Sequence, residues 1–160
     1  MSDFKNHKIV LQNNATAWEP CLILSDSIGC GTNIGALSHI GSNVTIGKDC
    51  RIQGSVYIAD GCTIGDEVFI GPNATLTNDR YPPSGGIWKP VIVQNKVVIG
   101  ANSTIVAGAV LNAECIVGAG SVVTSDVPAR EVWAGNPARF MMTLSEYNAK
   151  RDLNEQNSSM

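Results

Sequence analysis

The sequence predicts an all-β fold, a parallel β-helix in which the chain coils through six-residue repeats. A branched aliphatic residue recurs at every sixth position, and glycine commonly follows it. A period of six matches neither an amphipathic α-helix nor a hairpin meander, but it fits short strands joined by tight turns in a coiling chain. The aliphatic positions are Leu22, Ile28, Ile34, Ile40, Ile46, Ile52, Ile58, Ile64, Ile70 and Leu76, then Val93, Ile99, Ile105, Leu111, Val117 and Val123.

Two further positions of the repeat support this fold. The residue two before each aliphatic position is small or moderate in size, and strand alternation points it inward. Cys50, Cys62 and Cys115 occupy this position, which predicts that they are buried packing residues. The third residue after the aliphatic position often tolerates positive φ, as a corner requires. These corner residues are Gly31, Asn43, Asp49, Gly61, Asn73, Asn102, Gly108 and Gly120.

The repeat is interrupted at two places. The first interruption, about 77–91, contains "TNDRYPPSGGIWKP" and predicts a loop extruded from one corner, where function is commonly found. At the second, Pro128 and Pro137 are expected to end the ladder, and weak helical character follows. We therefore expect one domain over 1–160, with a β-helix at 10–127 that includes the loop and a C-terminal extension at 128–160.

Composition restricts the possible partners and locations. The 160 residues carry a net charge of −3 and only 16% charged residues, which gives no electrostatic reason to expect nucleic acid or an anionic membrane as a partner. No apolar run reaches the roughly 18 residues that span a bilayer. The N-terminus also lacks the apolar centre of a signal peptide, so a cytoplasmic location is expected. The five cysteines form no C-x-x-C pair, which gives little support to a zinc or disulfide site.

Four segments carry a family resemblance over nearly the whole chain. They are "DEVFIGPNATLTNDRYPPS" (66–84), "VVIGANSTIVAGAVL" (97–111), "VGAGSVVTSDVP" (117–128) and "AGNPAR" (134–139). They resemble the hexapeptide-repeat acyltransferases of the left-handed β-helix class, and the left hand of the coil is taken from this resemblance. The first segment is most similar to the branch that N-acetylates nucleotide-linked amino sugars for surface polysaccharides.

The resemblance implies a homotrimer with each active site in a groove between neighbouring β-helices, and acetyl-CoA as co-substrate without a metal. Carried over by motif, the residues lining the CoA groove would be Gly100, Ala101, Gly118 and Ala119. Arg139 would meet the CoA phosphates, and Pro137 would flank the adenine. For the glycines and alanines, turn geometry alone is an equally open interpretation.

The loop suggests the acceptor. O-acetylating relatives carry a histidine in this region, because a hydroxyl group needs a good base, whereas 76–90 contains none. A neutral amine is nucleophilic without one, so nitrogen is favoured over oxygen. We expect Asn78 to hold the acceptor amine or the thioester carbonyl, and Asp79 to attract the ammonium form. The alternative for both is an Asx-turn that starts the loop.

Other candidates lie around this pair. His39 is the best candidate for a side-chain base and should point outward, where a neighbouring subunit could meet it; the alternative is an ordinary surface histidine. Arg80 could bind phosphate, while Tyr81 and Trp88 could stack on a nucleotide or sugar. A loop that merely packs on the next subunit remains open.

The sequence thus favours an acetyl-CoA-dependent N-acetyltransferase of a UDP- or dTDP-linked amino sugar, with direct attack by the amine and no acetyl-enzyme. One rival is an O-acetyltransferase of a sugar or another small hydroxyl acceptor, such as serine. A γ-class carbonic anhydrase needs three zinc-bound histidines, and this chain has only His7 and His39. A non-catalytic assembly module is the last rival, and the "TND" and "GNPAR" segments argue against it.

Overall fold

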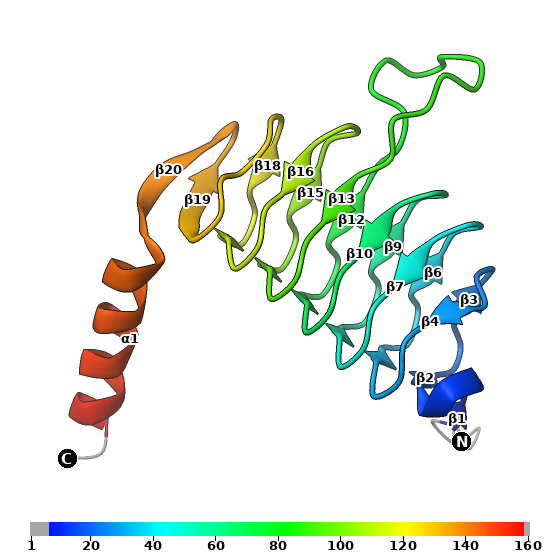
Figure 1. Ribbon diagram of the computed structural model, residues 1–160, viewed down its shortest axis with the longest axis horizontal. Helices are drawn as coiled ribbons and strands as arrows, with labels where there is room; N and C mark the ends of the chain where they lie inside the picture. The colour runs from blue at the N-terminus through cyan, green and yellow to red at the C-terminus, as the bar shows by residue number, and fades with distance from the viewer. Residues whose placement is uncertain (1–6, 159–160) are drawn as a thin grey trace, which may run out of the picture.

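The computed structural model describes residues 7–158, and the chain winds through them as a parallel β-helix with three flat sides (Figure 1). From β2 to β18, consecutive strands lie on different sides, and strands three places apart in the chain pair in parallel. Sheet A has the order β1-β2-β5-β8-β11-β14-β17-β19-β20, sheet B is β18-β15-β12-β9-β6-β3, and sheet C is β16-β13-β10-β7-β4. The left-handed β-helix expected from the sequence is confirmed.

The strands that build the coils are mostly two residues long. Their bounds are β1 Lys8–Val10, β2 Thr16–Trp18, β3 Leu22–Ile23, β4 Ser27–Ile28, β5 Asn33–Ile34, β6 His39–Ile40, β7 Thr45–Ile46, β8 Arg51–Ile52, β9 Tyr57–Ile58, β10 Thr63–Ile64, β11 Phe69–Ile70, β12 Thr75–Leu76, β13 Ile92–Val93, β14 Val98–Ile99, β15 Thr104–Ile105, β16 Val110–Leu111, β17 Ile116–Val117, β18 Val122–Val123, β19 Glu131–Gly135 and β20 Ala138–Thr143. A short 3-10 turn covers Gln12–Asn14, and helix α1 covers Leu144–Ser158.

The core is a set of vertical columns of aliphatic side chains. In sheet A the register pairs Ile34 with Ile52, Ile52 with Ile70, and Ile70 with Ile99. Each of these side chains is buried, which contributes roughly 1.5–3 kcal/mol relative to exposure. The stacked columns therefore supply most of the apolar burial that holds the coils together.

Three of the cysteines fill the smaller inward positions, as predicted. Cys50, Cys62 and Cys115 are all buried. Burial raises the pKa of the Cys62 thiol to about 11 and the pKa of the Cys115 thiol to about 12. Both groups are therefore neutral near pH 7 and act as small apolar side chains.

The corners follow the prediction and extend it. All eight predicted corner residues have positive φ. The same corner position is also left-handed at residues that rarely adopt this conformation: Leu37, Ser55, Glu67, Lys96 and Glu114. This conformation costs about 1–2 kcal/mol for a residue with a Cβ atom. Stacking between adjacent coils imposes the corner shape regardless of the residue there.

The first coil departs from the predicted phase. Leu22 was expected to be inward, but it is 49% exposed and pairs with the outward-facing His39. Ile23 is the inward residue and pairs with Ile40. Ile28 follows Ile23 by five positions instead of six, so a strict count of six from Ile28 back to Leu22 fails at this shorter corner.

The C-terminal extension contains more structure than predicted. Helix α1 is present and projects away from the coils (Figure 1). The sequence did not predict that β19 would add to sheet A parallel to β17, beyond Pro128. β20 then returns antiparallel to β19, after a turn in which Gly135 has a φ of 101°. Sheet A therefore ends in the hairpin of β19 and β20. β19 can still pair with β17 although the six-residue repeat is lost in this segment.

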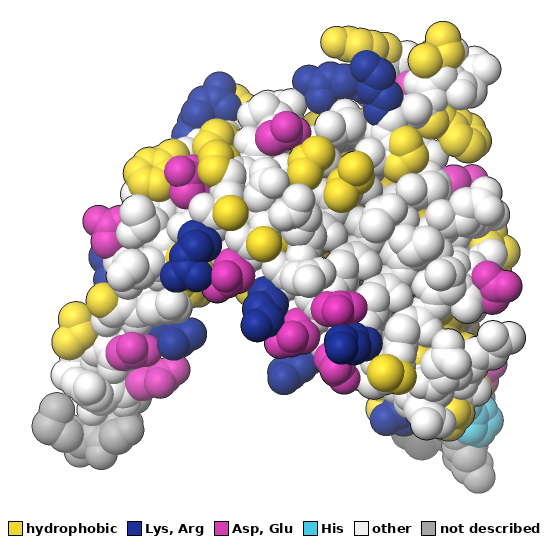
Figure 2. All heavy atoms as spheres, viewed as in Figure 1, with side chains coloured by type: hydrophobic (Ala, Val, Ile, Leu, Met, Phe, Trp, Pro, Cys, Tyr) yellow, Lys and Arg dark blue, Asp and Glu magenta, His cyan; other side chains and the backbone are white. Residues whose placement is uncertain are grey.

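Basic and acidic side chains alternate along the lower edge of the molecule in Figure 2. Among the ion pairs between neighbouring coils are Lys96 with Glu67 and Arg130 with Glu114. Within residues 7–158, no helix combines the length and the apolar character needed to cross a bilayer.

The aliphatic columns generate a direct prediction. Replacing the buried Ile64 with Asp should cost several kcal/mol, because a charge would replace a close-packed side chain, and should abolish the folded state. The exposed neighbour Thr63 on the same strand is the matched control. Circular dichroism during thermal unfolding should show a loss of the transition for Ile64→Asp and a near-normal transition for Thr63→Asp; equal stability of the two variants would contradict the column model.

Candidate active site

The loop at 77–91 replaces the corner between sheets B and C in the coil formed by β11, β12 and β13, and it stands out from the body (Figure 1). Corners of the adjacent coils flank it, at 59–61 and 106–108. Thr77 ties its start to the next coil, since its hydroxyl donates to the Ile105 carbonyl at 3.3 Å and accepts from the Ala107 N–H at 2.8 Å. The start of the loop is therefore fixed by the scaffold.

Asn78 lies at the narrow base of the loop. Its side-chain amide donates to the Asp60 carbonyl at 3.2 Å, and its own carbonyl accepts from the Lys89 N–H at 2.7 Å. The second bond joins the two ends of the loop. An asparagine amide has a second N–H and an acceptor oxygen, and these could meet a ligand.

Asp79 organises the start of the loop. One carboxylate oxygen accepts from the Tyr81 N–H at 3.1 Å, and the other accepts from the Ser84 N–H at 2.9 Å. These bonds, that from Ser84 above all, hold the pKa of Asp79 below its usual range, so the group is ionised near pH 7. The alternative of an Asx-turn is therefore observed here, and it leaves a negative charge at the loop surface.

The other predicted loop residues divide into two groups. Arg80 turns back to the body, where its two terminal nitrogens donate to the carbonyls of Ala107 at 3.1 Å and Thr124 at 3.0 Å. Tyr81 and Trp88 are instead 81% and 52% exposed, so their rings are available to a ligand or a neighbouring molecule.

A pocket of about 340 Å³ lies on the loop. Its lining residues are Asp79, Arg80, Tyr81, Ser84, Ile87 and Lys89. The sequence reasoning missed Lys89. The available signal was that Lys89 is the one lysine in the interruption, placed between Trp88 and Pro90.

His39 lies on the outer side of sheet B and stacks on Tyr57, with ring centroids 4.8 Å apart and an interplanar angle of 27°. Its strand β6 is two strands away from β12, where the loop starts. Two strand spacings amount to about 10 Å along the axis. Within one chain the structure therefore does not bring His39 together with Asn78.

The glycines predicted to line the CoA groove lie at the corner between sheets A and B, and coil packing explains them. A Cβ atom on Gly100 would come within 2.4 Å of the Ala119 nitrogen in the next coil. A Cβ atom on Gly118 would come within 2.8 Å of the Ala134 Cβ on β19. Ala119 is exposed and Ala101 is half-buried, so these alanine side chains remain on the surface of this corner.

The hairpin of β19 and β20 lies beside this corner, since the Gly118 N–H donates to the Trp133 carbonyl at 2.8 Å. Pro137 lies at the turn of the hairpin and is exposed. Arg139 is also exposed, and one of its terminal nitrogens donates to the Ala138 carbonyl at 2.8 Å. The predicted cofactor residues thus gather at one edge of sheet B and the loop residues at the other, with the width of that sheet between them.

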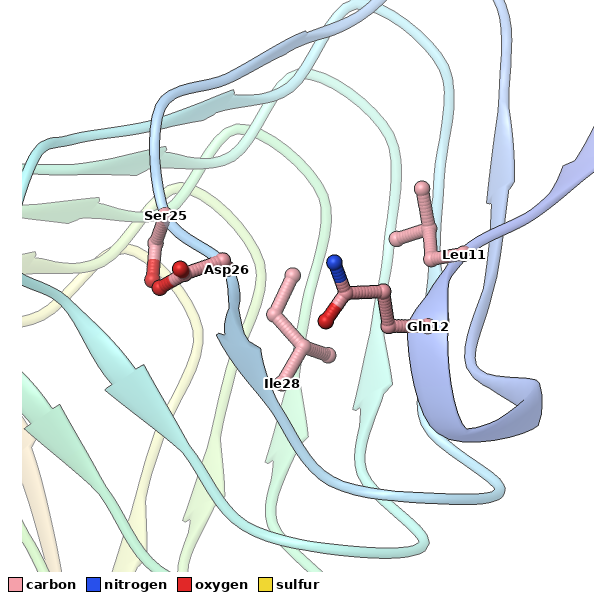
Figure 3. A pocket seen from close by; sticks show the side chains of 5 residues that line it. All are labelled: Leu11, Gln12, Ser25, Asp26 and Ile28. Carbon is pink, nitrogen blue, oxygen red and sulfur yellow. The ribbon is translucent and has the colours of Figure 1, made fainter.

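A smaller hollow of about 170 Å³ lies at the first coil (Figure 3). Leu11, Gln12, Ser25, Asp26 and Ile28 line it. It lies three coils before the loop, so it is not part of the same site. Over the described residues 7–158, no cluster of three or more His, Cys, Asp or Glu side chains could hold a metal ion.

Two models of hexapeptide repeats match this chain. The bacterial transferase hexapeptide (six repeats) matches residues 27–60, and the hexapeptide repeat of succinyl-transferase matches 90–125. The fold is a left-handed β-helix, and the two matched stretches carry its hexapeptide repeats. They confirm the resemblance to the hexapeptide-repeat acyltransferases.

Particular relatives carry the comparison further. A 2,3,4,5-tetrahydropyridine-2,6-dicarboxylate N-acetyltransferase of Staphylococcus aureus is 46% identical over 65 residues, which cover 41% of this chain and 26% of that protein. The chain thus matches about a quarter of the length of these curated relatives. The hexapeptide-repeat acetyltransferase VCA0836 from Vibrio cholerae is 34% identical, with a TM-score of 0.57 over 64% of this chain and 63% of the other.

Two further structures are similar. WeeI from Acinetobacter baumannii is 29% identical, with a TM-score of 0.69 over 79% of this chain and 57% of the other. AntD, an N-acyltransferase from Bacillus cereus, is 20% identical, with a TM-score of 0.68 over 90% of this chain and 89% of the other; this comparison supports the fold alone.

The corner between sheets A and B generates a paired prediction. Gly100→Ala should lower stability by about 1–3 kcal/mol, because the new methyl group has no space against the next coil. Ala119→Val, on an exposed side chain, should keep normal stability and weaken CoA binding. Thermal unfolding and calorimetric titration with CoA separate the two effects. A fully stable Gly100→Ala would contradict the packing explanation, and unchanged CoA affinity in Ala119→Val would remove that surface from the groove.

Proposed function

We propose that this protein is an acetyl-CoA-dependent N-acetyltransferase that acts on the amino group of a nucleotide-linked (UDP or dTDP) amino sugar. It works as a homotrimer in the cytoplasm and serves the synthesis of surface polysaccharides. The observation that carries the proposal is the loop on a transferase β-helix, which is tied to the scaffold and presents Asn78 and an ionised Asp79 beside a pocket.

Similar proteins support the chemistry. The curated relatives are N-acetyltransferases, and VCA0836 from Vibrio cholerae has been solved in complex with acetyl-CoA at 33% identity, with a TM-score of 0.57 over 64% of this chain and 61% of the other. AntD has been solved with dTDP and 3-hydroxybutyryl-CoA, so this fold can hold a nucleotide and a CoA thioester together. Acetyl-CoA as co-substrate and a nucleotide sugar as acceptor are consistent with both.

The proposed reaction is a direct transfer. The acceptor amine loses a proton and attacks the thioester carbonyl carbon, which gives a tetrahedral intermediate. The carbon–sulfur bond then breaks, the amide forms, and the CoA thiolate takes up a proton. Gly100, Ala101, Gly118 and Ala119, with Pro137 and Arg139, form the CoA side of the site, and Asn78 holds the amine or the thioester carbonyl.

The acidic and the basic group have different tasks in the proposed reaction. Asp79 attracts the ammonium form of the acceptor, but its lowered pKa makes it a weak base. His39 of a neighbouring subunit is our candidate for the group that accepts the proton. The buried thiols of Cys62 and Cys115 are protonated, which is consistent with transfer that forms no acetyl-enzyme.

Asn78→Ala tests the role of the loop. It should lower kcat at least about tenfold with the fold intact, because the group that positions the amine or the thioester is lost. Initial rates with radiolabelled acetyl-CoA and a panel of UDP- and dTDP-linked amino sugars would measure the effect. The matched control is Asn112→Ala, which removes a similar bond from a side-chain amide to the Val127 carbonyl, 2.9 Å long, outside the loop. Wild-type turnover by Asn78→Ala would remove Asn78 from the mechanism.

His39→Ala tests the base in the same assay. A general base contributes about 10²–10⁴-fold, so kcat/KM should fall about a hundredfold or more. Tyr57→Leu removes the stacked ring but leaves the imidazole, and it should keep most of the activity. An unchanged rate for His39→Ala would show that no proton passes through this side chain.

A further inference from the structure

The pocket on the loop has charged side chains in its lining. Two basic residues line the pocket, Arg80 and Lys89, together with the carboxylate of Asp79. Figure 2 shows basic side chains beside hydrophobic ones where the loop leaves the body at the top of the view. The contacts of the two basic side chains differ, and the difference assigns them different roles.

Arg80 is occupied by the scaffold. Its two terminal nitrogens donate to the carbonyls of Ala107 and Thr124, which belong to the corners of the two following coils. A fork of this kind joins three layers of the β-helix at one point. The guanidinium keeps three other N–H donors, but it could turn this fork toward a phosphate only by breaking both bonds to the scaffold. Arg80 therefore acts on the loop as a positioning residue.

The backbone of Lys89 is tied to the base of the loop, its stem runs beside Gly108, and its ammonium is left for a ligand. Its N–H donates to the Asn78 carbonyl at 2.7 Å, which places Lys89 opposite Asn78 at the base of the loop. The Lys89 Cβ and Cδ atoms pass within 3.4 and 3.7 Å of the position that a Gly108 Cβ would occupy. In the described part of the chain, no carboxylate lies within ion-pair distance of the Lys89 ammonium.

We propose that Lys89, and not Arg80, binds the diphosphate of the nucleotide-linked acceptor, while Arg80 holds the loop in place. This inference rests on the proposed function. The pocket carries a negative group, Asp79, and a positive group, Lys89. An amino sugar linked to a nucleotide carries the opposite pair, an ammonium group at the sugar and a diphosphate further along. The two charges would orient the acceptor with its amine toward Asp79 and Asn78.

The test uses the nucleotide itself, so that it does not depend on turnover. The affinity of the full-length protein for UDP and for dTDP is measured by calorimetry at low ionic strength. Lys89→Met should raise Kd at least about fivefold for the nucleotide that binds, while Lys89→Arg should stay within about twofold, because charge is retained. Lys48→Met, at a corner between sheets C and A, is the matched surface control and should leave Kd unchanged. Inorganic pyrophosphate should compete with the nucleotide for the wild-type protein.

A second measurement separates binding from loop order. Chymotrypsin cleavage after Trp88 should be faster in Arg80→Lys, which loses the fork but keeps the charge, and should change little in Lys89→Met. Wild-type affinity of Lys89→Met for the nucleotide would overturn the inference. So would a wild-type protein that binds neither nucleotide, or a Lys89→Met variant that loses affinity for CoA alone. Lysine-dependent nucleotide binding without acetyl transfer would support the site and reject the proposed reaction.

Discussion

The stacking of aliphatic side chains in register is the interaction on which the structure depends. From β3 to β18, each strand contributes an inward aliphatic residue, and parallel pairing stacks it on that of the strand three places away. Because the pairing is parallel and nearly every coil has the same length, the columns continue without a change of register. The short strands have few hydrogen bonds of their own, so the columns and the ladder between coils hold the chain together jointly. The corners, the loop and the hairpin take the positions that this stack allows.

The periodicity was sufficient to predict most of the fold. The inward aliphatic position, the small residue two places earlier and the left-handed corners all follow from a period of six. In a repeating coil, each position of the repeat has the same environment and backbone conformation in every turn. The failures lie where the repeat changes. Leu22 was misplaced since one corner is a residue shorter, and the parallel pairing of β19 was missed because no aliphatic hexad marks it. Residues such as Glu67 and Lys96 at left-handed corners were also unpredictable, since their own preferences oppose the conformation that the stack imposes.

The candidate site was predicted less completely than the fold. The interruption of the repeat located the loop, and the residue types in that segment pointed to Asn78 and Asp79. The partners of these residues could not be found from the sequence, because Asp60, Ala107 and Thr124 become neighbours only through the coiling of the chain. For the same reason, the sequence showed neither the bonds of Arg80 to the scaffold nor the place of Lys89 in the pocket lining. The spacing of the repeat identifies which residues belong to the loop. Only the three-dimensional contacts identify which loop side chains hydrogen-bond to the neighbouring coils.

The loop at 77–91 makes one coil of the β-helix different from the others. Successive coils are nearly interchangeable, and an uninterrupted column of them would offer the same surface at every level. By lengthening one corner of one coil, the chain breaks this screw symmetry and defines one level as different from the others. One level of a repetitive scaffold thereby differs from all the others. The neighbouring coils lie at fixed distances from that level, so an elongated ligand lying along the axis would meet each coil at a defined position.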